Sequence, residues 1–377
     1  MRLVAYRTVK GMSLVELMVA LVIGSILMLG VVQIFGASRT AYQLSEGMAR
    51  TQENARFAID YLQRDLRMAG HWGCVNDQSH LQSAGAMASH FPSGNDPLNF
   101  AVSIQAYEAT GTAPGDAVTL GAAASGWSPA LPGTISGLNP LPGSDILVLR
   151  YLSNQGAPVN AITMSGSSTS FTVPVERWSA LTGDGVSAPR LFGIADCSFV
   201  DIFPASAVSA GAGMVTTGSA IDRYTAQPSG QTVLYRADSV VYYIGAGASG
   251  EPALRRARHD GTAYVSEELV EGVESMQLVF GRDRVTDLTT KPPSGYIDDY
   301  GTAEDIGANA DQWRRVGSVQ VGLVMRSPEP AAAPQPTEEG LRVRALGVRF
   351  DPSANGDGRV RASYETTVAL RNRLYGN

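Results

Sequence analysis

The sequence predicts an α+β protein in which a long N-terminal helix, transmembrane and then amphipathic, packs on a β-rich head of antiparallel sheets. Three observations lead to this prediction. An uncharged apolar run follows Glu16, and an apolar pattern of helical period continues from there to Ala69. The rest of the chain alternates short apolar strand patterns with turns rich in the chain's 41 Gly and 20 Pro residues.

The apolar run is long enough to cross a membrane. It extends from Leu17 to about Gly36, and no charged residue follows Glu16 until Arg39. About 20 residues rising 1.5 Å each span the ~30 Å hydrocarbon core as a helix. Three basic residues precede the run: Arg2, Arg7 and Lys10. Because basic flanks stay on the cytoplasmic side, we expect a single-pass protein of the inner membrane with a periplasmic head.

Glu16 lies at the start of this run. A carboxylate at the centre of a membrane helix costs about 2.5–3.5 kcal/mol on insertion scales, and less near the edge, so an acid here is a functional candidate. If the chain is cut after Gly11, Met12 carries a free ammonium group one helical turn before Glu16. This ammonium or that of a neighbouring subunit could neutralise the carboxylate, and the second arrangement would set the axial register of assembly.

The order of these features resembles the class III signal of type IV pilins and type II secretion pseudopilins. An ordinary secretory signal has its small-residue cleavage site after the apolar region, whereas Gly11 precedes it. The resemblance implies a cleaved cytoplasmic leader of residues 1–11, cut by a prepilin peptidase, and N-methylation of Met12. A plain single-pass anchor with a chance glutamate is the alternative.

One continuous helix is expected over residues 12–69, with its membrane part at about 12–36. Apolar residues recur at three- and four-residue steps beyond the membrane: Leu44, Met48, Ala55, Ala58, Leu62 and Leu66. Gly70 stands where a C-terminal cap is expected. Four glycines mark places where the helix could bend: Gly24, Gly30, Gly36 and Gly47.

Residues 70–377 form the expected periplasmic head. Strands are predicted at 144–152, 170–175, 194–203, 239–244 and 318–325, and in 269–281, where Met276, Leu278 and Phe280 share one face. A terminal hairpin is predicted between 343–350 and 359–370. Residues 75–145 and 204–231 are turn-rich and carry no clear pattern.

Four segments resemble the PilW family of minor pilins: 65–74, 194–203, 269–281 and 366–373. The first two contain the chain's two cysteines, Cys74 and Cys197. In an oxidising periplasm these two are expected to form a disulfide, with two buried free thiols as the alternative.

No catalytic or cofactor motif stands out. The chain has no HExxH, no zinc-type Cys/His spacing and no GxSxG, so we expect neither an enzyme nor a cofactor. Gly245 to Gly250 reads formally as GxGxxG, but Glu251 and Pro252 follow it, which favours a hairpin turn over a nucleotide site.

A weak calcium candidate has oxygen side chains at alternate positions: Asp351, Ser353, Asn355 and Asp357. Ala362 stands where a calcium loop has its bidentate acid, so a hairpin turn is the preferred interpretation. The formal charge of −6 argues against nucleic-acid binding. A short basic cluster, Arg255, Arg256 and Arg258, has no interleaved aromatic residues and is expected to be a solvated edge.

The resemblance implies a non-catalytic minor pilin that joins an initiating or tip complex for pilus assembly and twitching motility. Its expected partners are other minor pilins, the major pilin, the prepilin peptidase and inner-membrane lipid, with a large tip adhesin as a further candidate. Two alternatives stay open: a type II secretion minor pseudopilin, and a tip adhesin module that binds a surface ligand.

Overall fold

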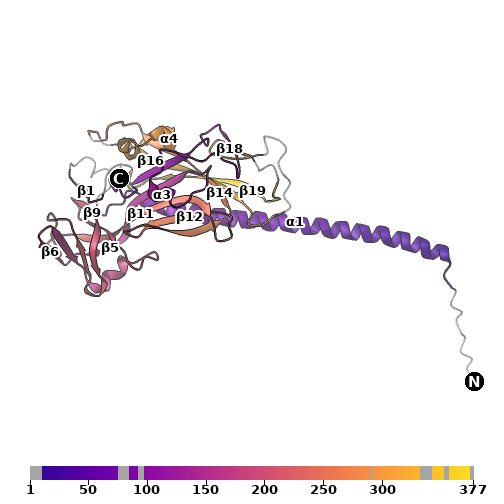
Figure 1. Cartoon of the computed structure of the whole chain (residues 1–377), viewed down its shortest axis with the longest axis horizontal. Helices are drawn as coiled ribbons and strands as arrows, with labels where there is room; N and C mark the ends of the chain where they lie inside the picture. Colours follow the sequence, from indigo (N-terminus) through magenta and orange to yellow (C-terminus); the bar gives the residue numbers. More distant parts are fainter. Residues whose placement is uncertain are drawn as a thin grey trace, which may run out of the picture.

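The computed structural model describes residues 11–74, 85–91, 97–288, 290–291, 293–331, 342–351 and 356–373. A single long helix, α1 (Leu14–Met68), leads from the N-terminal end into a head built mainly of β-strands (Figure 1). The expected α+β architecture is therefore confirmed. The strands that the structure describes pair antiparallel except in two short parallel pairs, β1 with β9 and β18 with β3.

Helix α1 is one unbroken helix of 55 residues, about 80 Å long. Ser13 caps its first turn, and Ala69 is the C-terminal cap residue. Gly70 follows in the left-handed region at φ +75°, as a glycine after a helix end commonly does. The His71 N–H then donates to the Met68 carbonyl at 2.9 Å and closes the last turn.

Only the second half of α1 touches the head. Its buried residues recur at steps of three and four, which places them on one stripe: Gly47, Thr51, Ala55, Ala58, Leu62, Asp65 and Leu66. The first residues of this stripe are small, so the helix backbone lies close to the head. A Cβ at Gly47 would lie 2.8 Å from the Cβ of Ala331. Gly47 is therefore a packing residue and not a bend.

The larger sheet has twelve strands among the described residues. Its main path runs β4-β2-β5-β11-β8-β9-β10-β7-β6, while β12 and β13 extend from β11 and β1 pairs with β9. The strands are β1 (Met87–Ser89), β2 (Ile104–Ala109), β4 (Trp127–Ser128), β5 (Ile146–Pro158), β6 (Ala161–Ser165), β7 (Ser168–Thr172), β8 (Leu191–Ala195), β9 (Val200–Ser209), β10 (Met214–Thr217), β11 (Val233–Ala246), β12 (Pro252–His259) and β13 (Tyr264–Glu271).

Strands β6 to β10 and the 3-10 helices η1 (Val175–Ala180) and η2 (Ala210–Ala212) form what we call the β6–β10 lobe. The lobe has its own apolar core, which includes Phe171, Phe192, Phe203 and Val215. In Figure 1 it lies at the end of the head away from the N-terminus of α1.

Two smaller sheets complete the head. One has the order β15-β14-β16-β19 and the other β17-β18-β3. Their strands are β3 (Ala117–Thr119), β14 (Val273–Asp283), β15 (Ile297–Gly301), β16 (Val316–Arg326), β17 (Val343–Ala345), β18 (Val348–Asp351) and β19 (Arg361–Ala369). In the described part of the head, three short helices lie between strands: α3 (Gly133–Ser136), α4 (Ala303–Ile306) and α5 (Ala310–Arg314).

The main core joins α1 to both larger sheets. It contains side chains of Leu62 and Leu66 from the helix and of Tyr242 from β11. The predicted face of Met276, Leu278 and Phe280 on β14 belongs to this core, so that prediction is confirmed. The helix thus serves as part of the core and not as an appendage beside it.

Strand β16 is buried on both faces. The alternating apolar residues of the strand predicted at 318–325 are typical instead of a half-buried strand with one face in solvent. Val319 and Val321 face the main core. Val324, on the other face, packs with Val348 and Phe350 of β18. The third sheet covers a face that the alternating pattern left to solvent.

The single strand predicted at 194–203 is wrong. The chain forms β8 and β9 there, and these pair antiparallel across the turn that holds Cys197. One carboxylate oxygen of Asp196 accepts the N–H groups of Ser198 and Phe199, each at 2.7 Å. This Asp-led turn reverses the chain, and short polar side chains of this type favour such turns.

The predicted terminal hairpin is also wrong. Strands β17 and β18 form their own hairpin through Leu346 and Gly347, both at positive φ. Strand β18 then pairs in parallel with β3, while β19 pairs with β16. By contrast, the hairpin predicted around Gly245–Gly250 is confirmed, because β11 and β12 pair antiparallel across it.

Candidate functional site

The N-terminal end of α1 holds the first candidate residues, and Glu16 lies in the first helical turn. The Ser13 N–H donates to Glu16 Oε2 at 2.9 Å, and the Glu16 N–H donates to Ser13 Oγ at 3.2 Å. This reciprocal pair is a capping box. The sequence analysis missed it, although the Ser-x-x-Glu spacing before an apolar run is its known signature. Glu16 therefore has a partner within its own chain.

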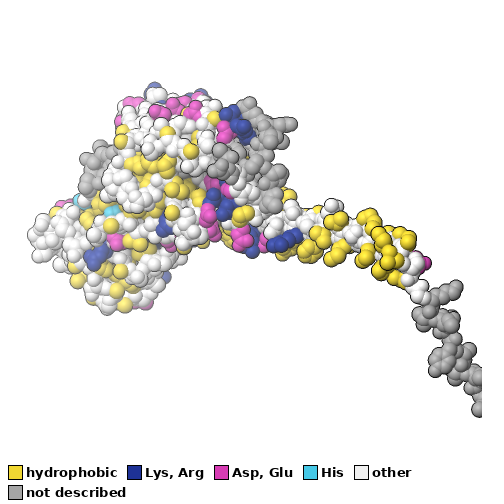
Figure 2. All heavy atoms as spheres, turned by 45° about the vertical axis from the view of Figure 1, so that its right-hand side comes forward, with side chains coloured by type: hydrophobic (Ala, Val, Ile, Leu, Met, Phe, Trp, Pro, Cys, Tyr) yellow, Lys and Arg dark blue, Asp and Glu magenta, His cyan; other side chains and the backbone are white. Residues whose placement is uncertain are grey.

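The first half of α1, up to Phe35, has its large side chains exposed in this structure, and we call it the bare half of the helix. Its large apolar side chains are exposed from Met12 to Phe35, with Leu14 at 75% and Phe35 at 72%. By length and composition the helix can cross a membrane, and none of its most apolar window is buried. Figure 2 shows this rod, with hydrophobic side chains in yellow, extending from the head. A surface of this size requires lipid or other helices around it.

Asp65 anchors the other half of α1 inside the head. The Tyr242 hydroxyl of β11 donates to Asp65 Oδ2 at 2.6 Å, and Arg256 of β12 donates to the same oxygen at 3.3 Å. Arg256 also pairs with Glu267 of β13 at 2.7 Å. Burial, reinforced by the Asp65 charge, raises the pKa of Tyr242 well above its ordinary value. The hydroxyl therefore stays protonated and remains a donor to Asp65.

Further contacts fix the helix along its length. Each joins a polar side chain of one element to another element of the head. Asn54 donates to the Glu271 carbonyl at 3.1 Å, Gln63 donates to Thr366 Oγ1 at 2.8 Å, Asn372 donates to the Arg67 carbonyl at 2.9 Å, and Arg64 pairs with Asp184. These contacts come from β13, β19, the C-terminal turn and the β6–β10 lobe, so helix and head form one unit.

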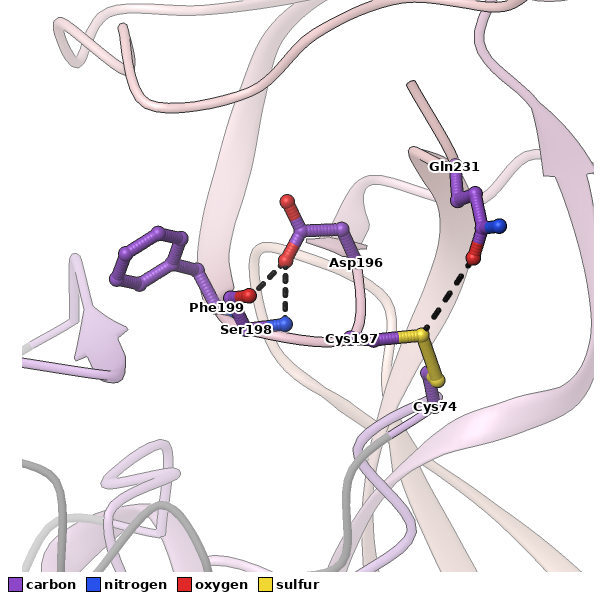
Figure 3. Close-up of a disulfide and its surroundings, with 6 residues drawn as sticks. All are labelled: Cys74, Asp196, Cys197, Ser198, Phe199 and Gln231. Carbon is purple, nitrogen blue, oxygen red and sulfur yellow. Dashed lines mark hydrogen bonds between the residues drawn. A yellow bond between two sulfur atoms is a disulfide. The ribbon is translucent and has the colours of Figure 1, made fainter.

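The predicted disulfide between Cys74 and Cys197 is present, with Cα atoms 4.9 Å apart (Figure 3). It joins the segment that follows α1 to the β8–β9 turn, across 123 residues of sequence. Gln231 Oε1 lies 3.7 Å from Cys197 Sγ. The bond therefore ties the end of the helix to the lobe.

The basic cluster of β12 is occupied by acidic partners. Arg255 faces Glu268 at 3.9 Å, Arg256 pairs with Asp65 and Glu267, and Arg258 pairs with Asp238 at 3.3 Å. The side chains of Arg256 and Arg258 are only 12% and 14% exposed. The cluster is thus part of the internal ion-pair network and not a free basic surface.

Only two residues of the calcium candidate, Asp351 and Asp357, lie among the described residues. Ser353 and Asn355 lie outside the described residues. Asp351 pairs with Arg342 at 2.5 Å, and Asp357 pairs with Arg361 at 2.7 Å. The hydrogen bond from Arg361 lowers the pKa of Asp357 to about 2. Over the part of the chain that the structure describes, no three His, Cys, Asp or Glu side chains gather as a metal would require.

A buried carboxyl pair was not expected from the sequence. Glu108 of β2 and Asp145, just before β5, are 2% and 1% exposed. Asp145 accepts the N–H groups of Ala109 and Leu278 at 2.9 and 2.8 Å, and so joins β2 to β14. The Thr112 hydroxyl lies within 3.5 Å of both carboxyl groups.

Both carboxyl groups hold protons more tightly than usual. Burial, reinforced by Asp145, raises the pKa of Glu108 to about 9, and burial raises the pKa of Asp145 to about 7. The available signal was that Glu108 lies within one apolar strand pattern and Asp145 directly before another. Their hydrogen bonds to backbone groups give them a structural role in joining the sheets.

Comparisons with known proteins match two parts of the chain. The model of the family described as type IV pilus-assembly protein W matches residues 241–372, and that of the prokaryotic N-terminal methylation motif matches residues 6–32. A search of curated proteins gave no match.

Among solved structures, the chain is similar to a type IV-like pilin from Thermus thermophilus, at 13% identity and a TM-score of 0.22. The similarity covers 59% of this chain and 86% of that one.

The two family matches fall on different parts of the chain. The methylation motif covers Gly11, Met12, Glu16 and most of the bare half of α1. The pilus-assembly match begins within β11 and extends past β19, so it includes most of the head's contacts with α1 and excludes strands β6 to β10. The resemblance predicted from sequence is confirmed: this chain carries a type IV pilus-assembly protein W domain behind an N-terminal methylation motif.

Proposed function

We propose that this chain is a minor pilin that joins other minor pilins and the major pilin to start a type IV pilus. In this proposal residues 1–11 are a cytoplasmic leader, residues 12–69 the helix, and residues 70–377 a periplasmic head. A prepilin peptidase cuts after Gly11 and Met12 is N-methylated. The protein stays in the inner membrane until assembly moves it into the filament, near the tip. It catalyses no reaction.

The observation that carries the proposal is the contrast between the two halves of α1. The second half of α1 is fixed in the core of the head, whereas large apolar side chains from Leu14 to Phe35 have no protein partner among the described residues. Burying one such side chain is worth ~1.5–3 kcal/mol. Lipid provides this environment before assembly and neighbouring helices provide it afterwards. The helix can therefore pass from membrane to filament without unfolding the head.

Glu16 has the chemistry to join two subunits. Its Oε2 accepts the Ser13 N–H, while its Oε1 has no hydrogen bond to any described residue. Cleavage after Gly11 leaves Ser13 in place, so the capping box persists in the mature chain. The ammonium group of Met12 from a neighbouring subunit is a partner of the right charge for the open oxygen. Such a pair would form only at one axial register.

The test separates the charge of Glu16 from its capping role. Glu16→Gln keeps an oxygen that can accept the Ser13 N–H, because glutamine also serves in capping boxes. It removes the charge that attracts an ammonium group. We expect normal protein levels, normal cleavage and at least a fivefold loss of surface pili.

Glu53→Ala is the matched control, since Glu53 is another exposed acid on the same helix. It should leave pilus number unchanged. Wild-type pilus numbers in both Glu16→Gln and Glu16→Ala strains would contradict the proposed pairing. Loss of exoprotein secretion with intact twitching motility in a null strain would assign the chain to a type II secretion system instead.

A further inference from the structure

A pocket of about 440 Å³ lies between the β6–β10 lobe and strands β11, β12 and β13. The loop 184–191, which leads into β8, forms one side of it. Residues 236–238 and 258–260 form the other side, and β13 closes one end with Val265 and Glu267. This volume falls within the range of small-molecule sites, which often lie where two structural units meet.

The walls of the pocket are partly apolar. Val186, Pro189 and Leu191 come from the loop, and Ala237 and Val265 come from the strands. Arg64 of α1 pairs with Asp184 at the start of this loop, and Arg236 also reaches Asp184 at 3.4 Å. The loop is therefore fastened to the helix and to β11, so the pocket is formed without a ligand.

The polar part of the pocket balances positive against negative charge. Arg236 and Asp238, each with a 3% exposed side chain, pair at 3.0 Å, and Arg258 pairs with Asp238 at 3.3 Å. The Arg258 side chain makes no hydrogen bond to any described residue, and its Nη1 is buried against Asp238, so the N–H groups of Nε and Nη2 remain for a ligand. Arg190 adds an exposed guanidinium at the rim.

Acceptors line the same pocket as these donors. Glu267 uses Oε1 for Arg256, and its Oε2 has no partner among the described residues. Asp260 Oδ1 accepts the N–H groups of Thr262 and Ala263, and Asp260 Oδ2 likewise has no side-chain partner among the described residues. The pocket thus presents guanidinium donors and carboxylate acceptors side by side.

This balance excludes strongly charged ligands. An anion would meet Asp260 and Glu267, and a cation would meet Arg190 and Arg258. A hydroxyl both donates and accepts, so neighbouring hydroxyls on one ligand can satisfy a guanidinium and a carboxylate together. A ring with C–H groups on its faces would also suit the apolar walls.

We propose that this pocket binds a neutral saccharide. The site goes beyond the assembly role, because it lies in the head and uses no residue of the bare helix. Its loop belongs to a part of the chain outside both family matches. It would give a subunit near the pilus tip a contact with glycan-bearing surfaces.

The test uses the full-length protein in a zwitterionic detergent that has no sugar headgroup. Saturation-transfer NMR is recorded with D-glucose, D-galactose, D-mannose and N-acetyl-D-glucosamine, and with acetate and putrescine as charged probes. At least one sugar should bind with a Kd of 10 mM or tighter. Neither charged probe should bind in competition with it.

Two variants fill the pocket from different elements: Ala188→Trp from the loop and Val265→Trp from β13. Both positions are exposed, so the fold should tolerate the larger side chain. Each should weaken sugar binding at least tenfold. The matched control is Ala207→Trp, at an exposed position on β9 of the same lobe.

Absence of binding by all four sugars, or equal binding by all three variants, would overturn the proposal. So would a charged probe that displaces the sugar. Pilus number in an Ala188→Trp strain should be normal, and Glu16→Gln protein should still bind sugar, so failure of this proposal and of the assembly role can be told apart.

Discussion

Replacing Asp65 should loosen α1 from the head while leaving its membrane half unchanged. Asp65 is 5% exposed and is the shared acceptor of Tyr242 and Arg256. Alanine removes this acceptor. Tyr242 then keeps a weak contact at 3.4 Å to the Tyr61 carbonyl, and Arg256 keeps Glu267, whose side chain is 54% exposed.

The magnitude follows from these remaining partners. Removing one partner of a buried ion pair costs about 3–5 kcal/mol when the other charge is left alone, and an unmade buried hydrogen bond costs about 1–3 kcal/mol. Because Arg256 keeps Glu267, we expect a loss of about 2–3 kcal/mol for Asp65→Ala. Tyr242→Phe should lose about 1 kcal/mol, since Arg256 still pairs with Asp65.

Hydrogen exchange measured by mass spectrometry on residues 55–68 is the appropriate assay, because it reports the opening of this helix segment. The double variant should lose less than the sum of the two single variants by about 1 kcal/mol, because both remove the same bond. Asp60→Ala, at an exposed position on the same helix, is the control. A change below 0.5 kcal/mol for Asp65→Ala, or full additivity in the double variant, would refute this reasoning.

The other predictions concern the head and its contact with α1. The raised pKa of Glu108, about 9, means that the folded chain holds a proton that the unfolded chain loses, so stability should fall as pH rises from about 4.5 to 9. In Glu108→Gln the free energy of unfolding, measured by urea titration at several pH values, should depend less on pH. The same pH dependence as in the wild-type protein would contradict this prediction. Cys74→Ala removes the disulfide and should lower the free energy of unfolding by up to ~5 kcal/mol. The wild-type protein in dithiothreitol should show the same loss. Equal melting temperatures of the wild-type protein with and without reductant would contradict this prediction. Gly47→Ala should destabilise the head by ~1–3 kcal/mol through contact with Ala331, whereas Gly36→Ala, with open space around it, should not; equal melting temperatures would contradict this.

The helix could be predicted almost completely because its signal is local. The charge-free run after Glu16 and the three- and four-residue steps beyond Leu44 depend only on neighbouring residues. The close approach of Gly47 could not be predicted, because its neighbour Ala331 lies far away in the sequence. The same glycine therefore reads as a weak point in sequence and is a packing residue in the fold.

The anchoring of α1 depended on long-range contacts that no local pattern contains. Asp65 pairs with residues 177 and 191 positions away. The burial of Glu108 and Asp145 was not predicted, because it results from the packing of sheets on each other. A carboxylate that accepts backbone N–H groups from two sheets can be identified only once the sheets are placed.

The β6–β10 lobe was predicted only in part, for a different reason. Strands were expected at 170–175 and 194–203, but residues 204–231 are rich in small residues, with Gly and Ser that favour turns, and yet β10 forms there between β7 and β9. Its strand conformation is imposed by the neighbouring strands and by Val215 in the lobe core. The Asp196 turn was missed because the apolar residues on both sides of Cys197 read as one continuous strand.

The proposed assembly role requires that a processed α1 carries its charged end into contact with neighbouring subunits. This processing can be measured by intact-mass and peptide mass spectrometry of the protein from native pili or inner membranes. We predict a chain that begins at N-methylated Met12, with Cys74 and Cys197 joined. A native chain that still begins at Met1 would contradict it.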